Sequence, residues 1–229
     1  MTKVFCKLTN SFISKIDKGV FFALEKYLIN SGLASDKDSF EVIKSHLQNP
    51  PLFTPSEFAE EVIYVILASG FKQKIAKQKF FEITDFIKKE NQAIPENLLK
   101  IFGNKNKINA ICKVWNNKEE YCENFYKLQS IDEKLNYLEK LPHIGAITKN
   151  HIARNLGINK VKYDVWIQRL GISICGKNDM TVSSQLCPET KKACDKMFKS
   201  IEKETGLSIG YIDVVLWKSC QIGLLEFKE

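Results

Sequence analysis

The stretch Leu141-Pro142-His143-Ile144-Gly145 lies between two segments whose apolar residues recur with the spacing of a helix. Pro142 prevents the first helix from continuing, because proline lacks a backbone N–H and clashes with the preceding turn. Gly145 has no Cβ, so the backbone there can come close to a docked group. The stretch therefore predicts a tight helix-hairpin-helix, and the backbone N–H groups that begin its second helix suit a phosphate.

An acidic residue, Asp164, follows in the run Lys162-Tyr163-Asp164-Val165-Trp166-Ile167-Gln168-Arg169-Leu170. Asp164 can cap the helix that starts at Val165, because an aspartate side chain accepts hydrogen bonds from first-turn N–H groups. An ionised carboxylate at this place can also serve as a general base or stabilise a developing positive charge. The sequence leaves both roles open.

Nearly all other segments predict helices as well. The expected helical ranges are 12–28, 35–47 with Ser35 or Asp38 as the cap, 54–69, 73–88, 101–115, 118–128, 131–141, 147–156, 163–170, 189–205 and 209–225. No alternating strand pattern and no internal repeat is present. We therefore predict an all-α fold, a single domain of residues 1–229 with approximate lobes 1–50 plus 172–229 and 51–171. A DNA-binding cleft between the lobes would carry the hairpin and Asp164.

The charge of the chain is compatible with a polyanion-binding surface but does not require one. The formal net charge is +7, and of the 34 basic residues only Arg154 and Arg169 are arginines. Both follow the hairpin, where the planar guanidinium is hard to replace if phosphate or carboxylate must be held. The lysine-rich segment 72–79 is either a solvated helix face or a phosphate contact.

The seven cysteines do not predict a metal centre. They include no C-x-x-C pair, so a zinc site is not expected. Cys187 and Cys194 have the C-x6-C spacing that opens one iron–sulfur motif, but the remaining C-x2-C-x5-C is absent, and we predict no cluster. No apolar run approaches the ~20 residues that span a bilayer, and the N-terminus is too polar for a signal peptide. We expect an intracellular protein with reduced thiols and no membrane association.

The chain resembles the helix-hairpin-helix (HhH-GPD) superfamily of DNA glycosylases, nearest to the compact second type of 8-oxoguanine DNA glycosylase. The resemblance covers roughly residues 50–229, and the hairpin and Asp164 carry most of its specificity. The other resembling residues are Gly145, His151, Arg154, Asn155, Gly157 and Arg169, with weaker matches at 65–69, 104–107 and 212–217.

The resemblance implies a base-excision enzyme that acts on double-stranded DNA containing a damaged or modified base, and we expect a monomer. The base would be flipped out of the stack, and Asp164 would stabilise positive charge on the sugar and orient or deprotonate the attacking water. The implied DNA contacts are Leu141, Pro142, His143, Ile144, Gly145, Thr148 and Arg169. The implied base pocket comprises Ser69, Phe71, Ile147, His151, Trp166, Asp213 and Trp217. Backbone carbonyls at Glu139, Leu141 and Ile144 would hold a monovalent cation, Na+ or K+, with no other cofactor.

The chain departs from the resembling family at Ile147. Bifunctional members have a lysine there that attacks the sugar carbon, and an isoleucine cannot be an amine nucleophile. Lys149 lies two residues further, about 200° away around a helix. We therefore expect a monofunctional glycosylase. The alternatives are a catalytically silent DNA-binding protein, or a bifunctional 8-oxoguanine glycosylase/AP lyase that uses a relocated lysine, Lys149 or one near the C-terminus.

Several candidate residues also have structural interpretations. His151, Trp166 and Trp217 can be core residues, and Arg154 with Asn155 can tie the hairpin helix to its neighbours. Asp213 either reads the edge of a base or caps a buried group. The turn Ser69-Gly70-Phe71 can insert into the duplex. The excised base is not predicted, and oxidised purine, alkylated purine and hypermodified pyrimidine stay open.

Overall fold

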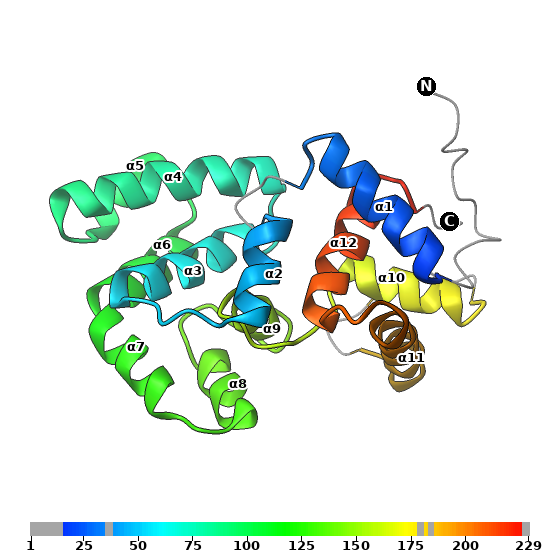
Figure 1. The fold of residues 1–229 in the computed structure, drawn as a ribbon. Helices are drawn as coiled ribbons and strands as arrows, with labels where there is room; N and C mark the ends of the chain where they lie inside the picture. Colours follow the sequence, from blue (N-terminus) through cyan, green and yellow to red (C-terminus); the bar gives the residue numbers. More distant parts are fainter. Residues whose placement is uncertain (1–15, 35–38, 178–180, 183–185, 226–229) are drawn as a thin grey trace. The chain divides into compact units, whose positions relative to one another are not determined.

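The computed structural model describes residues 16–34, 39–177, 181–182 and 186–225. Within these residues the chain forms twelve helices and no β-strand (Figure 1). This confirms the all-α prediction. The helices form two compact units, one of residues 1–48 with 159–229 and one of residues 49–158. Each unit has its own hydrophobic core.

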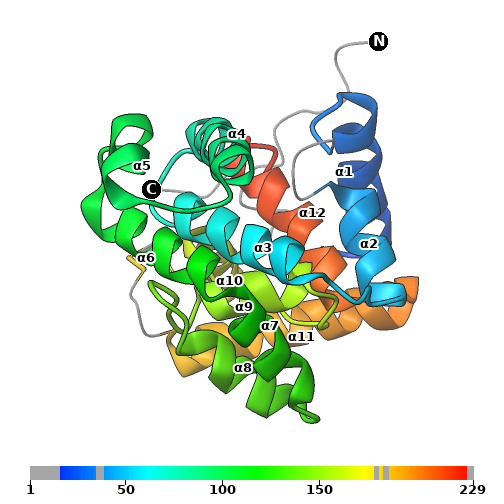
Figure 2. The ribbon, with the colours of Figure 1, turned by 90° about the vertical axis from the view of Figure 1, so that its left-hand side faces the viewer.

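In the unit of residues 49–158, α3 lies among the other helices and contacts four of them, α4, α6, α7 and α9 (Figure 2). Its start is fixed by a capping box, because Thr54 Oγ1 accepts from Glu57 N–H while Glu57 Oε2 accepts from Thr54 N–H at 2.8 Å. The helices are α3 (Pro55–Ala68), α4 (Gln73–Glu90), α5 (Pro95–Ile101), α6 (Lys105–Asn116), α7 (Lys118–Lys127), α8 (Ile131–Glu139) and α9 (Thr148–Asn155).

In the other unit, α12 has the central position and contacts α1, α2, α10 and α11. Nearly every residue from Gly210 to Cys220 is buried, as expected of a helix that is covered on all sides. The helices are α1 (Lys18–Asn30), α2 (Phe40–Gln48), α10 (Val165–Ile174), α11 (Pro188–Thr205) and α12 (Ile209–Gln221).

The second boundary between the units differs from the expected one. It lies after Ile158 instead of Gly171, because α10 packs against α11 and α12. Residues 95–100 lie outside the expected helical ranges, but together with Ile101 they form the short helix α5, with Pro95 in the first turn, where proline is tolerated.

The expected starts of the two N-terminal helices lie largely outside the described residues. Residues 12–15 and the candidate caps Ser35 and Asp38 are among the residues that are not described. In the described part, Ser39 Oγ accepts from Val42 N–H at 3.2 Å near the start of α2.

Gly171 allows α10 and α11 to pack closely, and its replacement tests this packing. A Cβ at Gly171 would lie 2.4 Å from Cys194 Sγ and 3.0 Å from the backbone oxygen of Thr190. We expect Gly171→Ala to lower the free energy of unfolding by about 1–3 kcal/mol through overpacking, although alanine is the better helix former. Denaturant unfolding measures the change. The control is Gly103→Ala, whose Cβ would meet nothing within 4 Å; equal stability of the two variants would contradict the close packing.

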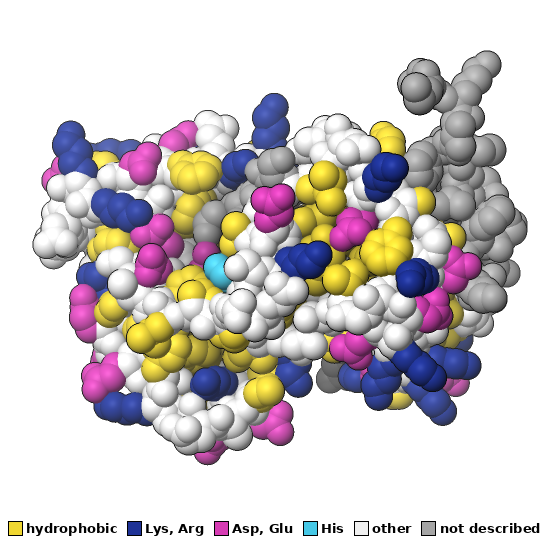
Figure 3. All heavy atoms as spheres, in the orientation of Figure 1, with side chains coloured by type: hydrophobic (Ala, Val, Ile, Leu, Met, Phe, Trp, Pro, Cys, Tyr) yellow, Lys and Arg dark blue, Asp and Glu magenta, His cyan; other side chains and the backbone are white. Residues whose placement is uncertain are grey.

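Basic and acidic side chains are interspersed on the face shown in Figure 3. Lysine and arginine do not gather into one patch on the described surface of this face. None of the described helices has the length and apolar character that crossing a membrane requires.

Candidate functional site

The residues of the predicted hairpin form α8, a short turn and α9 in the unit of residues 49–158, and the two helices contact each other. Leu141 and Ile144 anchor the turn, because both side chains are buried in the core. The Ile144 N–H also donates to the Leu141 carbonyl at 3.1 Å. The apolar positions Leu141 and Ile144 therefore serve the core, and the exposed positions of the turn are Lys140, His143, Gly145 and Ala146.

His143 has a left-handed backbone, with φ of 62°. Residues other than glycine uncommonly adopt this left-handed conformation, although histidine does so more often than most. Desolvation by the surrounding protein atoms, together with the positive charge of Lys107, lowers the pKa of His143. The imidazole is therefore neutral at neutral pH and can donate one hydrogen bond to an anion without adding a full charge.

The backbone between Gly145 and Thr148 begins the second helix of the hairpin. The Gly145 N–H donates to Thr148 Oγ1 at 2.8 Å, so this hydroxyl orders the turn. A Cβ placed on Gly145 would meet nothing within 4 Å. The surface beside Gly145 is thus open, as the docking of another molecule at this turn requires.

The inner face of α9 is packed against α3. His151 is 4% exposed and its ring lies edge-on to Tyr64 at a centroid distance of 6.1 Å. Asn155 Nδ2 donates to Glu61 Oε2 at 2.9 Å, and Arg154 is also buried. The contacts of His151 and Asn155 and the burial of Arg154 favour the structural interpretation of all three residues.

Neither Ile147, which stands where the resembling family has its lysine, nor the nearby Lys149 offers a free amino group. Ile147 is the half-buried N-cap residue of α9. Lys149 Nζ forms an ion pair with Glu139 Oε2 at 2.5 Å, which joins α9 to α8. The Glu139 side chain, near the proposed cation position, is therefore engaged by Lys149.

Three residues predicted from the sequence are gathered around Lys107 of α6. The Lys107 ammonium donates to the backbone oxygens of Ile66, Leu67 and Ser69 at 2.6, 3.2 and 2.5 Å. It also lies 4.4 Å from the centre of the Phe71 ring, and its charge acts on His143. Burial lowers the pKa of Lys107 to about 8, so at neutral pH the ammonium binds the carboxyl end of α3 and fixes the turn that carries Ser69 and Phe71.

Asp164 lies in the other unit, where it is the N-cap of α10. Its Oδ1 accepts from the N–H groups of Trp166 at 3.0 Å and Ile167 at 3.4 Å. The capping role is therefore present in the structure. Its Oδ2 faces the Lys162 ammonium at 3.2 Å, and the Asp164 side chain is 15% exposed.

Lys162 connects three of the predicted residues of this unit. Its backbone N–H donates to Asp213 Oδ2 at 3.1 Å, its ammonium pairs with Asp164, and the same ammonium lies 5.7 Å from the centre of the Trp217 ring. Asp213 is completely buried, which favours its interpretation as a structural acceptor. Trp217 is half-buried beside this ion pair.

Trp166 and Arg169 form a separate pair on α10. The guanidinium carbon of Arg169 lies 5.6 Å from the centre of the Trp166 ring, and both side chains are half-buried. Stacking on an indole orients the guanidinium. The Trp166 ring and the Arg169 guanidinium thus lie next to each other on the helix that Asp164 caps.

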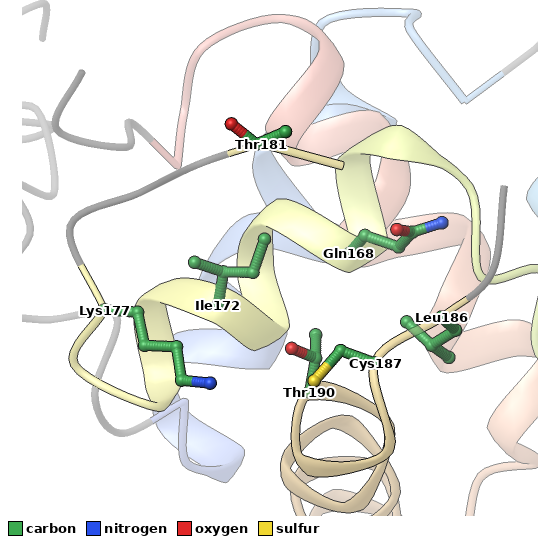
Figure 4. Close-up of a pocket in the computed structure, with 7 residues that line it drawn as sticks. All are labelled: Gln168, Ile172, Lys177, Thr181, Leu186, Cys187 and Thr190. Carbon is green, nitrogen blue, oxygen red and sulfur yellow. The ribbon is translucent and has the colours of Figure 1, made fainter. Parts of the chain in front are cut away.

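Sequence reasoning did not identify a pocket of about 200 Å³ in the unit that contains α10 (Figure 4). It lies where the end of α10 faces the start of α11, and none of the predicted site residues lines it. Its lining residues are Gln168, Ile172, Lys177, Thr181, Leu186, Cys187 and Thr190.

Cys187, at the edge of this pocket, is expected to be the most reactive of the six described cysteines. Backbone N–H groups of Thr190 and Glu189 donate to its sulfur and lower its pKa, and the thiolate is the reactive form. Burial raises the pKa of Cys112 to about 11 and of Cys194 to about 12. Brief alkylation with iodoacetamide at neutral pH, followed by peptide mass analysis, should label Cys187 first. Earlier labelling of Cys194 would contradict the described packing.

No three His, Cys, Asp or Glu side chains of the described residues come together in an arrangement that could hold a metal ion. The carbonyls at Glu139, Leu141 and Ile144 belong to the turn between α8 and α9, and backbone oxygens are suitable donors for Na+ or K+. One lone pair of the Leu141 carbonyl is used by Ile144 N–H, and a carbonyl oxygen has two. The donor set is therefore compatible with a monovalent cation.

No protein-family model and no curated protein matches the chain. Among solved structures, it is similar to the Methanocaldococcus jannaschii 8-oxoguanine glycosylase/lyase in complex with a 15mer DNA containing 8-oxoguanine. The TM-score is 0.62 at 17% identity, over 91% of this chain and 100% of the other. The chain has the fold of an 8-oxoguanine DNA glycosylase. A second structure of a Methanocaldococcus jannaschii 8-oxoguanine DNA glycosylase gives a TM-score of 0.62 at 16% identity, over 92% of this chain and 96% of the other.

Proposed function

We propose that this protein is a DNA N-glycosylase, which binds duplex DNA through the hairpin and removes a damaged or modified base. The observation that supports this most is the glycosylase fold, which extends over 91% of the chain and the whole of the neighbour. Proteins that share a fold can differ in function, so the residues must support the chemistry. The open turn at Gly145 and the carboxylate of Asp164 do so.

The proposed reaction is hydrolysis of the N-glycosidic bond. The target nucleotide leaves the stack at a cost of a few kcal/mol, and positive charge develops on the sugar as the base departs. Asp164 stabilises this charge and orients or deprotonates the water that replaces the base. The direction of the carboxylate is fixed because its Oδ1 accepts hydrogen bonds from Trp166 N–H and Ile167 N–H.

Water is proposed as the attacking group because the hairpin has no available amine. Ile147 stands where an amine would be needed, and Lys149 is paired with Glu139 at 2.5 Å. This supports attack by water in the base-removal step, which is how a monofunctional glycosylase removes a base. We further propose that the protein acts as an intracellular monomer, with a Na+ or K+ ion held by the hairpin carbonyls.

The proposal is tested by incubating the protein with duplexes that each contain one lesion, then treating them with hot alkali, which breaks the strand wherever a base has been removed. 8-Oxoguanine is the first lesion, because the neighbour's complex contains it. Alkylated purines and hypermodified pyrimidines follow. Strand breaks at one lesion class support the proposal. Tight duplex binding without a break at any lesion would instead support a DNA-binding protein that does not excise bases.

A further inference from the structure

Lys162 places a primary amine beside the candidate catalytic carboxylate. Its Nζ lies 3.2 Å from Asp164 Oδ2, and the two side chains are 16% and 15% exposed. The pair is therefore largely buried but still has surface that a substrate atom can reach. Among the lysines of this unit, Lys177 and Lys191 pair with Glu189 and Asp195 instead.

Three contacts fix the position of this amine. The backbone N–H of Lys162 is held by the buried Asp213, its ammonium pairs with Asp164, and the Trp217 ring centre lies 5.7 Å away. Asp164 is itself held by the start of α10 through Oδ1. The carboxylate thus directs its second oxygen toward an amine that has little freedom to move away. A fixed amine next to a proton acceptor is the arrangement that carbonyl condensation requires.

We propose that Lys162 condenses with the abasic sugar that base removal produces; this inference rests on the proposed function. The ring-opened abasic sugar has an aldehyde at C1′. Asp164 takes one proton from the Lys162 ammonium, and the nitrogen lone pair forms a bond to C1′. This proton and a second one from the same nitrogen then pass to the former aldehyde oxygen, which leaves as water. The balance is one ammonium and one aldehyde giving one iminium ion and one water.

The same carboxylate can carry the reaction one step further. The iminium ion makes the C2′ hydrogens acidic, and Asp164 accepts one of these protons. The electron pair forms the C2′–C3′ double bond while the C3′–O bond breaks, and the 3′ phosphate leaves with the bonding electrons. The structure thus assigns to Lys162 a strand-nicking activity that does not use the hairpin and that follows the hydrolytic removal of the base as a separate step.

The test uses a duplex with one preformed abasic site, so the identity of the excised base does not enter. The full-length protein is mixed with this duplex and sodium borohydride, which reduces an iminium ion to a stable amine. We expect a covalent protein–DNA adduct on a denaturing gel with the wild type, and its loss with Lys162→Arg. Arginine keeps the positive charge beside Asp164 but stays protonated and forms no iminium ion under these conditions. Circular dichroism checks that each variant is folded, and Lys162→Gln serves if the arginine variant is not.

The matched control is Lys191→Gln. Lys191 belongs to the same unit, pairs with Asp195 at 2.6 Å and lies 5.3 Å from the Tyr163 ring centre, and its replacement should leave the adduct unchanged. The inference is overturned if the wild type forms no adduct, if the adduct persists in Lys162→Arg, or if Lys149→Gln abolishes it. The lesion panel tests base removal separately. Base release without an adduct would overturn only this inference, and an adduct without release of any base would overturn only the proposed glycosylase.

Discussion

Asp164→Asn is expected to lower the rate of base release by about 10²–10⁴-fold, the usual contribution of a positioned general base. The variant loses the negative charge that would face the sugar. It keeps a side-chain oxygen that can accept from Trp166 and Ile167 N–H, as Asp164 Oδ1 does. Asparagine and aspartate are similar N-caps, so α10 retains its start. Single-turnover base release on the lesion found by the panel measures the effect.

Asp164→Ser and Asp164→Ala separate the capping role from the chemical one. Serine also caps a helix, whereas alanine does not and should lower the free energy of unfolding by about 1 kcal/mol relative to serine. Both should release base as slowly as Asp164→Asn. Equal base release by the wild type and Asp164→Asn would remove Asp164 from the mechanism and leave it as a cap.

Gly145→Asp is expected to weaken duplex binding by about 100-fold, because two like charges brought together at an interface cost several kcal/mol, and each 1.4 kcal/mol is tenfold in affinity. A Cβ at Gly145 meets nothing within 4 Å in the free protein, and an acidic residue before a helix is favourable. The protein should therefore fold normally while a carboxylate occupies the place proposed for a phosphate. Fluorescence anisotropy with a labelled duplex at one fixed salt concentration measures the affinity.

Gly103→Asp is the matched control for this experiment. Gly103 also precedes a helix, α6, and a Cβ there also meets nothing within 4 Å. Both variants change the net charge equally. If they weaken binding to the same extent, the effect comes from net charge alone and the hairpin has no special role.

The sequence predicted most of the helices because their signals are local. Thr54 and Glu57 form the capping box, and Asn104 Oδ1 caps α6 by accepting from Lys107 N–H at 3.1 Å. The hairpin between α8 and α9 followed from Pro142 and the buried pair Leu141 and Ile144. Each of these features is decided by residues within a few positions of one another.

The boundary between the units is not determined by residues close to it in the sequence. Whether α10 belongs with the hairpin or with the C-terminal helices depends on its packing against α11 and α12, which involves Gly171, Thr190 and Cys194. Neither helical periodicity nor composition contains this information. The division was expected after residue 171 but lies after residue 158, which is 13 residues earlier in the chain.

Lys107 and Lys162, which contact several of the candidate residues, were not predicted to be site residues, although weak signals existed. Lys107 shares the buried face of α6 with Ile108 and Ile111, so helical periodicity places a lysine among apolar residues. Lys162 precedes Asp164 by two positions in a segment that is not helical, and in an extended chain alternate side chains lie on the same side. Only the structure shows which atoms these ammonium groups contact.

The Lys107 ammonium also gives the turn at residues 69–71 a sensitivity to mild alkali. Three carbonyl oxygens share the three N–H groups of one ammonium. With a pKa lowered to about 8, the group becomes a neutral amine with two N–H groups while the surface lysines are still charged. One carbonyl must then lose its donor, so the end of α3 would loosen locally before the positive charge of the surface declines.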